Sequence, residues 1–382
     1  MRNYRTIGRW LVLLGVITVL VAGCMPAGAV TNPGWTALTA KDRIVYAALA
    51  MGQVVALDNA EGGAEVWVYP AAAAGGGPGC GLVRSPGETP DRPLDAVYGP
   101  PVVTDGLLLV TSYDHHLYAF DRATGERLWE YSAKEPIIGS VTLYDDIAYF
   151  GSSDHGVYAL DLETRELVWK SPFYTANWVW GAPAVDAERV YVGSMDHYLY
   201  ALDRLTGELV WKTDVGGSIV GSVTLADGVL FVGGVDKRLH ALDKETGQEL
   251  WKTPEYRGWV WGEALVDGEY VYFGSLEGSI HALAIRDGSP RWEAVGLDGA
   301  VRAGPARYGT GLLVGTDTGK LYAIDMATGD KVLRFEAKGA ILSTPVVEGD
   351  IAYVGTAAGN IYALDLSRRG DPQLWVYPPP KK

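Results

Sequence analysis

The sequence lacks the short motifs that assign catalysis to a chain. It contains no Gly-x-Ser-x-Gly, no His-Glu-x-x-His and no phosphate-binding loop. Its carboxylates are scattered through the predicted turns, and no close pair of them follows from their spacing. We therefore expect no catalytic residue and no enzymatic activity.

Cysteine is scarce as well, because the chain has only Cys24 and Cys80. A positively charged start with three arginines precedes residues 10–22, an apolar or neutral stretch of 13 residues that is too short to cross a bilayer. The small residues Ala22 and Gly23 before Cys24 resemble the cleavage site of bacterial lipoproteins. The alternative is an ordinary secretory signal with an incidental cysteine.

The lipoprotein interpretation fixes the expected organisation of the N-terminus. Residues 1–23 would be the signal peptide, Cys24 the lipidated residue, and residues 24–34 a short tether. Met25 stands where some lipoproteins carry an Asp that retains them at the inner membrane. We expect an extracytoplasmic protein of the cell envelope, anchored to a membrane by lipid on Cys24.

Positive charge is also in short supply. The formal net charge is −14, and it becomes −17 without residues 1–23, which hold three arginines and no acidic residue. An acidic body argues against nucleic acid as a partner and against direct adsorption to anionic lipid. It suits a folded domain held at a membrane by its anchor.

What the chain has in abundance is a repeat of about forty residues. An Ala-Leu-Asp or related tripeptide is followed by a Thr-Gly turn and then by tryptophan, as in residues 201–211. A fixed period of this length indicates a repeat architecture. The Asp slot recurs at positions 58, 121, 161, 203, 243, 284, 325 and 365.

Each repeat unit contains four short runs rich in Val, Tyr, Leu and Trp, separated by turn residues. In one unit the runs are residues 178–185, 189–193, 198–202 and 208–213. Four-stranded units of this length are typical of propeller blades. We predict an all-β, eight-bladed β-propeller of four-stranded antiparallel blades over residues 35–377, with a Gly/Pro-rich insertion at 70–97 between blades one and two and a tail at 378–382.

The motif Ala-x-Asp-x-x-Thr-Gly-x-x-x-Trp resembles that of the quinoprotein-type (PQQ-repeat) propellers, with good matches in blades two, four and five. The resemblance implies that each motif tryptophan docks between neighbouring blades. Two blades depart from the pattern, with Ala284 in the Asp slot and Leu333 in the Trp slot. The tryptophans expected to be structural are Trp67, Trp129, Trp169, Trp211, Trp251, Trp292 and Trp375.

Two features of the sequence suggest chemistry as an alternative: the likeness to quinone-dependent enzymes and a group of histidines. Quinone-dependent dehydrogenases resemble this chain in their repeat, but they are longer, hold Ca²⁺ beside the quinone and typically carry two adjacent cysteines, which this sequence lacks. Four histidines fall in equivalent turns of blades two to four, where they read as turn residues because later blades place other residues there. We therefore expect no cofactor and no metal; the histidines are His115, His116, His155 and His197.

The clearest departure from the repeat is a Trp-Val-Trp-Gly segment in blades four and six. These tryptophans are additional to the docking set, and strand alternation places both members of a segment on one face. We expect them to form an aromatic rim at one mouth of the central channel and to bind a partner; packing inside the channel is the alternative. The candidate residues are Trp178, Trp180, Trp259, Trp261 and Arg302.

The expected function follows from this combination. At the level of architecture, the chain resembles the lipid-anchored propellers of this repeat family that take part in outer-membrane protein assembly. The resemblance implies a non-catalytic, monomeric scaffold that binds other envelope or membrane proteins. The alternatives are a small-ligand-binding or sensor propeller and, with less support, a quinone-dependent dehydrogenase.

Overall fold

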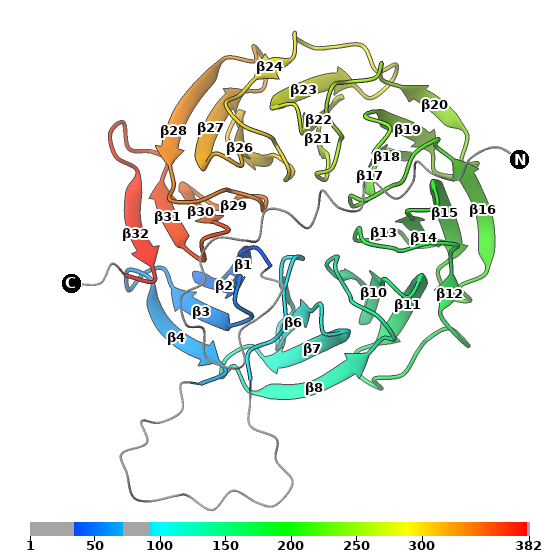
Figure 1. The fold of residues 1–382 in the computed structure, drawn as a ribbon, viewed down its shortest axis with the longest axis horizontal. Helices are drawn as coiled ribbons and strands as arrows, with labels where there is room; N and C mark the ends of the chain where they lie inside the picture. Colours follow the sequence, from blue (N-terminus) through cyan, green and yellow to red (C-terminus); the bar gives the residue numbers. More distant parts are fainter. Residues whose placement is uncertain (1–33, 72–91, 380–382) are drawn as a thin grey trace, which may run out of the picture. The chain divides into compact units, whose positions relative to one another are not determined.

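The computed structural model describes residues 34–71 and 92–379. The predicted signal peptide, Cys24, most of the tether, most of the predicted insertion with Cys80, and residues 380–382 lie outside the described residues. In the described part, 32 strands form eight four-stranded sheets, and no helix occurs. The sheets follow one another around a ring (Figure 1), which confirms the predicted all-β, eight-bladed propeller.

Each blade consists of four consecutive strands, and each neighbouring pair within a blade is antiparallel. The strands of blades one to four are β1 (Ala37–Lys41), β2 (Ile44–Ala48), β3 (Val54–Asp58), β4 (Ala64–Tyr69), β5 (Val102–Val103), β6 (Leu107–Thr111), β7 (His116–Asp121), β8 (Arg127–Ser132), β9 (Thr142–Tyr144), β10 (Ile147–Gly151), β11 (Gly156–Asp161), β12 (Phe173–Tyr174), β13 (Ala184–Val185), β14 (Arg189–Gly193), β15 (Tyr198–Asp203) and β16 (Leu209–Asp214). Those of blades five to eight are β17 (Thr224–Ala226), β18 (Val229–Gly233), β19 (Leu239–Asp243), β20 (Glu249–Lys252), β21 (Leu265–Asp267), β22 (Tyr270–Ser275), β23 (Ser279–Ala284), β24 (Val295–Gly296), β25 (Ala306–Tyr308), β26 (Gly311–Gly315), β27 (Lys320–Asp325), β28 (Lys331–Glu336), β29 (Val346–Glu348), β30 (Ile351–Gly355), β31 (Ile361–Asp365) and β32 (Gln373–Tyr377).

The turn between the third and fourth strands explains why the repeat keeps Asp, Thr and Gly. In blade four, Asp203 accepts hydrogen bonds from the backbone N–H of Leu205 at 3.0 Å and of Thr206 at 2.8 Å. The N–H of Thr206 stabilises the carboxylate and lowers the pKa of Asp203. Gly207 follows with a φ of 73°, in the left-handed region that favours glycine.

The core of the ring lies between the blades. Buried apolar side chains form eight clusters, each of which joins two neighbouring blades. In one of them, Tyr149 of blade three packs with Tyr200 of blade four around Trp169. Because each sheet buries both faces against its neighbours, the middle strands are almost continuously apolar.

The motif tryptophans lie at these junctions. The indole N–H of Trp169 donates to the carbonyl of Arg204 in the next blade at 2.9 Å, and a Cβ added to Gly207 would lie 2.5 Å from the indole. The glycine therefore provides the flat surface on which the ring packs. Four further tryptophans donate in the same way to the next blade: Trp67 to Arg122, Trp211 to Lys244, Trp251 to Ile285 and Trp292 to Met326.

Two junctions are built differently. Blade three has Arg165 in the glycine slot, with a φ of 62°, and its guanidinium carbon lies 6.0 Å from the ring centroid of Trp129. At blade seven, Leu333 is 48% exposed, and the neighbouring Arg334 donates to the carbonyls of Leu366 and Arg368 in blade eight at 2.8 and 2.9 Å. Arg334 therefore takes over the tryptophan's hydrogen bond, because the β-bulge in this hairpin is displaced along the strand.

Ring closure, which the sequence left open, is achieved by contact between two complete blades. Trp375 of blade eight donates to the side chain of Asn59 in blade one at 3.0 Å, and the hydroxyl of Tyr377 donates to Glu65 at 2.9 Å. One apolar cluster joins the same two blades. Blades one and eight each keep four strands of their own, so no strand is exchanged at the seam.

Candidate functional site

The first strands of the blades face the centre of the ring (Figure 1), and the segments that lead into them enclose a cavity of about 430 Å³. We call it the channel cavity. All eight blades contribute to its lining. The segments of neighbouring blades are in close backbone contact around the cavity. A Cβ added to Gly139, Gly181 or Gly221 would lie 2.0–2.3 Å from a carbonyl oxygen of the next blade.

Side chains alternate along each of these segments, so the residues before and after the ring glycine position both line the cavity. Those before it form one layer, which in blades two to eight consists of Tyr98, Ile138, Trp180, Val220, Trp261, Arg302 and Leu342. Those after it form a second layer of mostly small residues, namely Pro100, Ser140, Ala182, Ser222, Glu263, Gly304 and Thr344. Blade one adds Trp35, Leu38 and Thr39.

The five candidate residues of the sequence divide into two groups. Trp180, Trp261 and Arg302 line the channel cavity. Trp178 and Trp259 do not; they are 42% and 40% exposed. Each exposed indole stacks on its neighbour, with ring centroids 5.3 Å apart in Trp178–Trp180 and 6.2 Å apart in Trp259–Trp261. We call the four tryptophans and Arg302 the tryptophan rim.

The two segments of the rim are firmly held. The valine between each tryptophan pair, Val179 or Val260, is buried and packs against a glycine of the preceding blade. The carbonyl of Trp178 accepts from the backbone N–H of Met195 and that of Trp259 from the N–H of Leu276, each at 2.9 Å. The exposed indoles therefore stand on backbone that the fold fixes in position.

Electrostatics single out Arg302 and Glu263 within the cavity. The guanidinium carbon of Arg302 lies 5.9 Å from the ring centroid of Trp261. The side chain of Glu263 is exposed to solvent through the open mouth of the cavity, yet protein atoms crowd around its carboxyl, and the resulting desolvation raises the pKa of that carboxyl. Sequence reasoning missed Glu263, although a lone acidic residue in a layer of small residues was a signal that could have revealed it.

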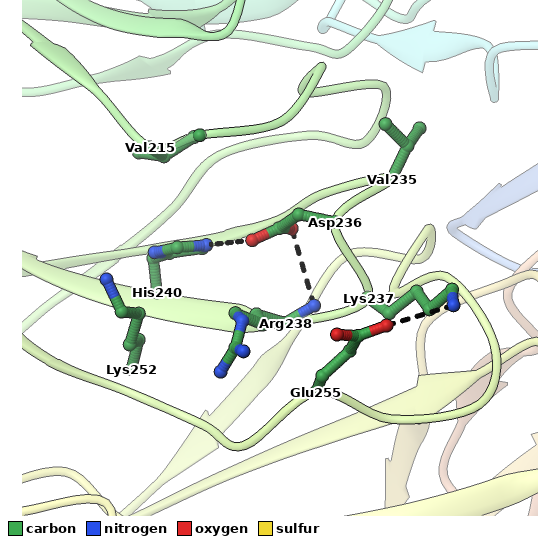
Figure 2. Close-up of a pocket in the computed structure, with 9 residues that line it drawn as sticks. Val215, Val235, Asp236, Lys237, Arg238, His240, Lys252 and Glu255 are labelled. Atoms are coloured by element: carbon green, nitrogen blue, oxygen red, sulfur yellow. Dashed lines mark hydrogen bonds and ion pairs between the residues drawn. The ribbon is translucent and has the colours of Figure 1, made fainter.

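A second hollow, of about 560 Å³, lies at the turn between β18 and β19 of blade five (Figure 2). Its charged groups satisfy one another: Lys237 binds Glu255 at 3.0 Å, and His240 binds Asp236 at 2.9 Å. The other ring nitrogen of His240 faces Glu249 at 2.8 Å. Because its polar groups are already paired, this hollow is a weaker candidate for a ligand site than the channel cavity.

The turn histidines adopt a conformation that explains their position. His115, His155 and His197 have φ values of 78°, 73° and 81°, and the same turn position holds Gly278 in blade six. The side-chain ring of His116 lies 2.7 Å from the carbonyl of Asp114. Among the described residues, no group of three or more His, Cys, Asp or Glu side chains is placed to hold a metal ion.

Cys24, the predicted lipidation site, lies outside the described residues, as does Cys80. In the part of the chain that the structure covers, no helix has the length and apolar character needed to cross a membrane.

Comparison with known proteins gives three results. No curated protein matches the chain. The computationally designed protein Ika8 is 16% identical over 88% of this chain and 98% of its own, with a TM-score of 0.73. BamB from Moraxella catarrhalis is 20% identical over 85% of this chain and 95% of its own, with a TM-score of 0.68. At these identities, both structures show the fold alone.

The third result concerns the family and agrees with the repeat described above. The model of the family described as outer membrane protein assembly factor BamB matches residues 27–177, 153–300 and 295–378. These segments overlap and span nearly the whole ring. The chain therefore belongs to the family of the outer membrane protein assembly factor BamB.

Proposed function

We propose that this protein is a non-catalytic scaffold of the cell envelope that docks another envelope protein through the tryptophan rim. The observation that carries the proposal is the pair of exposed indoles, Trp178 and Trp259, in equivalent positions of blades four and six. Tryptophan and arginine are the residues most enriched among interface anchors, and here both are mounted on fixed backbone.

The geometry of the rim suits a protein partner. Each exposed indole is backed by a second one, so its apolar face is presented without the entropy cost of ordering a flexible loop. The two segments stand two blades apart, which gives the partner two separate anchor points. Between them lies the charged turn of blade five, which supplies a polar border.

Family membership supports the finer parts of the proposal. The family is named for outer-membrane protein assembly, and we propose that role here, with the propeller monomeric and extracytoplasmic. Lipid on Cys24 would hold it at the membrane through the short segment that precedes blade one.

The test is a crosslinking pulldown from native membranes with the tagged full-length chain and identification by mass spectrometry. We expect a barrel-assembly or other envelope protein to be recovered with wild type and lost with the double variant Trp178→Ala/Trp259→Ala. Leu205→Ala is the matched control, because Leu205 is an exposed apolar residue on the β15–β16 turn. Equal recovery with wild type and the double variant would refute the rim as the docking site.

A small-ligand-binding role is the second candidate, and the aromatic channel cavity favours it.

A quinone-dependent activity is tested separately by adding PQQ and Ca²⁺ to the purified protein. We expect no quinone to remain bound to the protein after gel filtration, as measured by the absorbance of the quinone.

A further inference from the structure

Two side chains of opposite charge share the channel cavity without pairing. Glu263 belongs to the segment that enters blade six, and Arg302 to the segment that enters blade seven. Among the described residues, neither side chain forms an ion pair or a hydrogen bond, and the guanidinium of Arg302 lies over the face of Trp261. In the blade-five hollow, by contrast, each acidic residue that lines the hollow has a basic partner.

The repeat makes these two residues conspicuous. In the other blades, the position of Glu263 is occupied by Pro, Ser, Ala, Gly or Thr, and the position of Arg302 by an aromatic or aliphatic residue. The fold therefore needs neither charge. Although Glu263 is exposed to solvent through the open cavity, the protein atoms around it raise the pKa of its carboxyl, so a cation beside the carboxylate is favourable.

The walls of the cavity are suited to an organic cation. Trp35, Tyr98, Trp180 and Trp261 all line it. The indole N–H of Trp35 donates to the carbonyl of Tyr98 at 2.7 Å, and that of Trp180 to the hydroxyl of Ser153 at 3.1 Å. Because these donors are already used, the rings offer a ligand their apolar and π surfaces, which attract ammonium groups.

We propose that the channel cavity binds a small zwitterion, with its ammonium group against Glu263 and its carboxylate against Arg302. The two residues stand in adjacent layers of the cavity lining and on neighbouring blades, with Glu263 in the segment that enters blade six and Arg302 in the segment that enters blade seven. A short molecule with one charge at each end can reach both residues, and a volume of about 430 Å³ accommodates it. This site adds to the docking role and does not depend on it.

The competing arrangement is an internal ion pair, formed if Glu263 and Arg302 turn toward each other. That arrangement would leave nothing for a ligand to neutralise. It also predicts that removing either charge strands the other one in the cavity and destabilises the fold. The zwitterion site predicts that removing the charge of Glu263 does not destabilise the fold, because the carboxylate has no cationic partner in the empty protein.

The test is isothermal titration calorimetry of the full-length protein in detergent, with glycine betaine as the probe. We expect saturable binding at one site per chain and an affinity at least tenfold weaker in Glu263→Gln and in Arg302→Met. Choline, which has the cation but no carboxylate, should bind Arg302→Met as well as wild type and lose affinity in Glu263→Gln. Glu255→Gln, in the blade-five hollow, is the control that leaves every affinity unchanged.

Three outcomes would overturn the proposal: no saturable binding of glycine betaine to wild type, unchanged affinity in Glu263→Gln, or a lower melting temperature of Glu263→Gln at neutral pH. The double variant Trp178→Ala/Trp259→Ala distinguishes partner docking from zwitterion binding, because it removes no residue of the cavity lining. That variant should keep full affinity for glycine betaine while it loses the protein partner.

Discussion

The docking tryptophans and the rim tryptophans are the same residue type in two different environments. Trp169 is 2% exposed, and its N–H is bound to the next blade, whereas Trp178 is 42% exposed and stacks on a tryptophan of its own segment. The first belongs to the repeat and the second departs from it. The difference indicates that in a repeat fold the common residues hold the ring together and the exceptional ones are available for binding.

The strongest challenge to this comparison is Trp169→Ala. The variant loses a buried indole, its hydrogen bond to Arg204 and its packing on Gly207. We expect the free energy of unfolding to fall by about 3–5 kcal/mol, as measured by urea denaturation. A loss below about 1 kcal/mol would mean that the docking set does not hold the ring together.

Arg334→Met tests whether a non-tryptophan junction has the same role. The guanidinium of Arg334 donates to two carbonyls of blade eight, and methionine keeps the apolar stem but not the donors. We expect a loss of about 1–2 kcal/mol in the same denaturation experiment. Leu333→Ala, which changes the residue in the tryptophan slot of the repeat, should lower the free energy of unfolding by less than Arg334→Met does. A larger loss for Leu333→Ala would mean that the residue in the tryptophan slot holds this junction after all.

Trp178→Ala should show the reverse balance of effects. Its stacking on Trp180 is exposed, so the loss of stability is expected to be about 1 kcal/mol or less. Partner recovery in the pulldown should fall at least about tenfold, as for an interface anchor. If stability and partner recovery fell together, Trp178 would have a structural role like that of the motif tryptophans between the blades.

Glu263→Gln is expected to give the smallest change in stability, and it should raise the melting temperature where the tryptophan substitutions lower it. Because burial raises the pKa of Glu263, the folded protein keeps this proton to a higher pH than the unfolded chain does. The stability from this group is present below the unfolded pKa of about 4.3 and is lost as the pH rises through the folded value. The variant should therefore melt about 1 °C higher than wild type at pH 8.

At pH 3.5 the same substitution should leave the melting temperature unchanged, because wild-type Glu263 is protonated in both states. Thermal denaturation of both proteins at the two pH values provides the measurement. An equal shift at both values would show that the effect is steric and does not come from the charge.

The fold could be predicted because the repeat is local: the period, the Thr-Gly turn and the strand alternation all lie within a single unit. The details of closure could not, because Trp375 and Asn59 lie 316 positions apart and the indole donates to the side chain of Asn59, whereas motif tryptophans such as Trp169 donate to the backbone carbonyl of the equivalent residue. Arg334 escaped notice because a displaced bulge changes which residue reaches the next blade, and a count along the sequence assumes a constant bulge.

The candidate site shows the same division. Trp178 and Trp259 could be singled out as candidates because they are surplus to the repeat, and the alternation of the strand predicted that each would lie on the same face as its partner, on which it stacks. Glu263 could not be recognised from the residues up to the ring glycine position, because it follows that glycine. Whether a carboxylate at that position has a partner depends on side chains of other blades, which one segment of sequence does not reveal.

The seam between blades one and eight gives the ring an unusual freedom of connectivity. Seven junctions carry a covalent link in addition to their packing, and the eighth relies on side-chain contacts such as Trp375–Asn59 and Tyr377–Glu65. Because no strand crosses the seam, the ring of eight blades does not depend on which blade comes first in the sequence. A circular permutant that links blade eight to blade one and opens at another junction would still contain eight whole blades, and it would move the attachment point of any N-terminal anchor around the circumference.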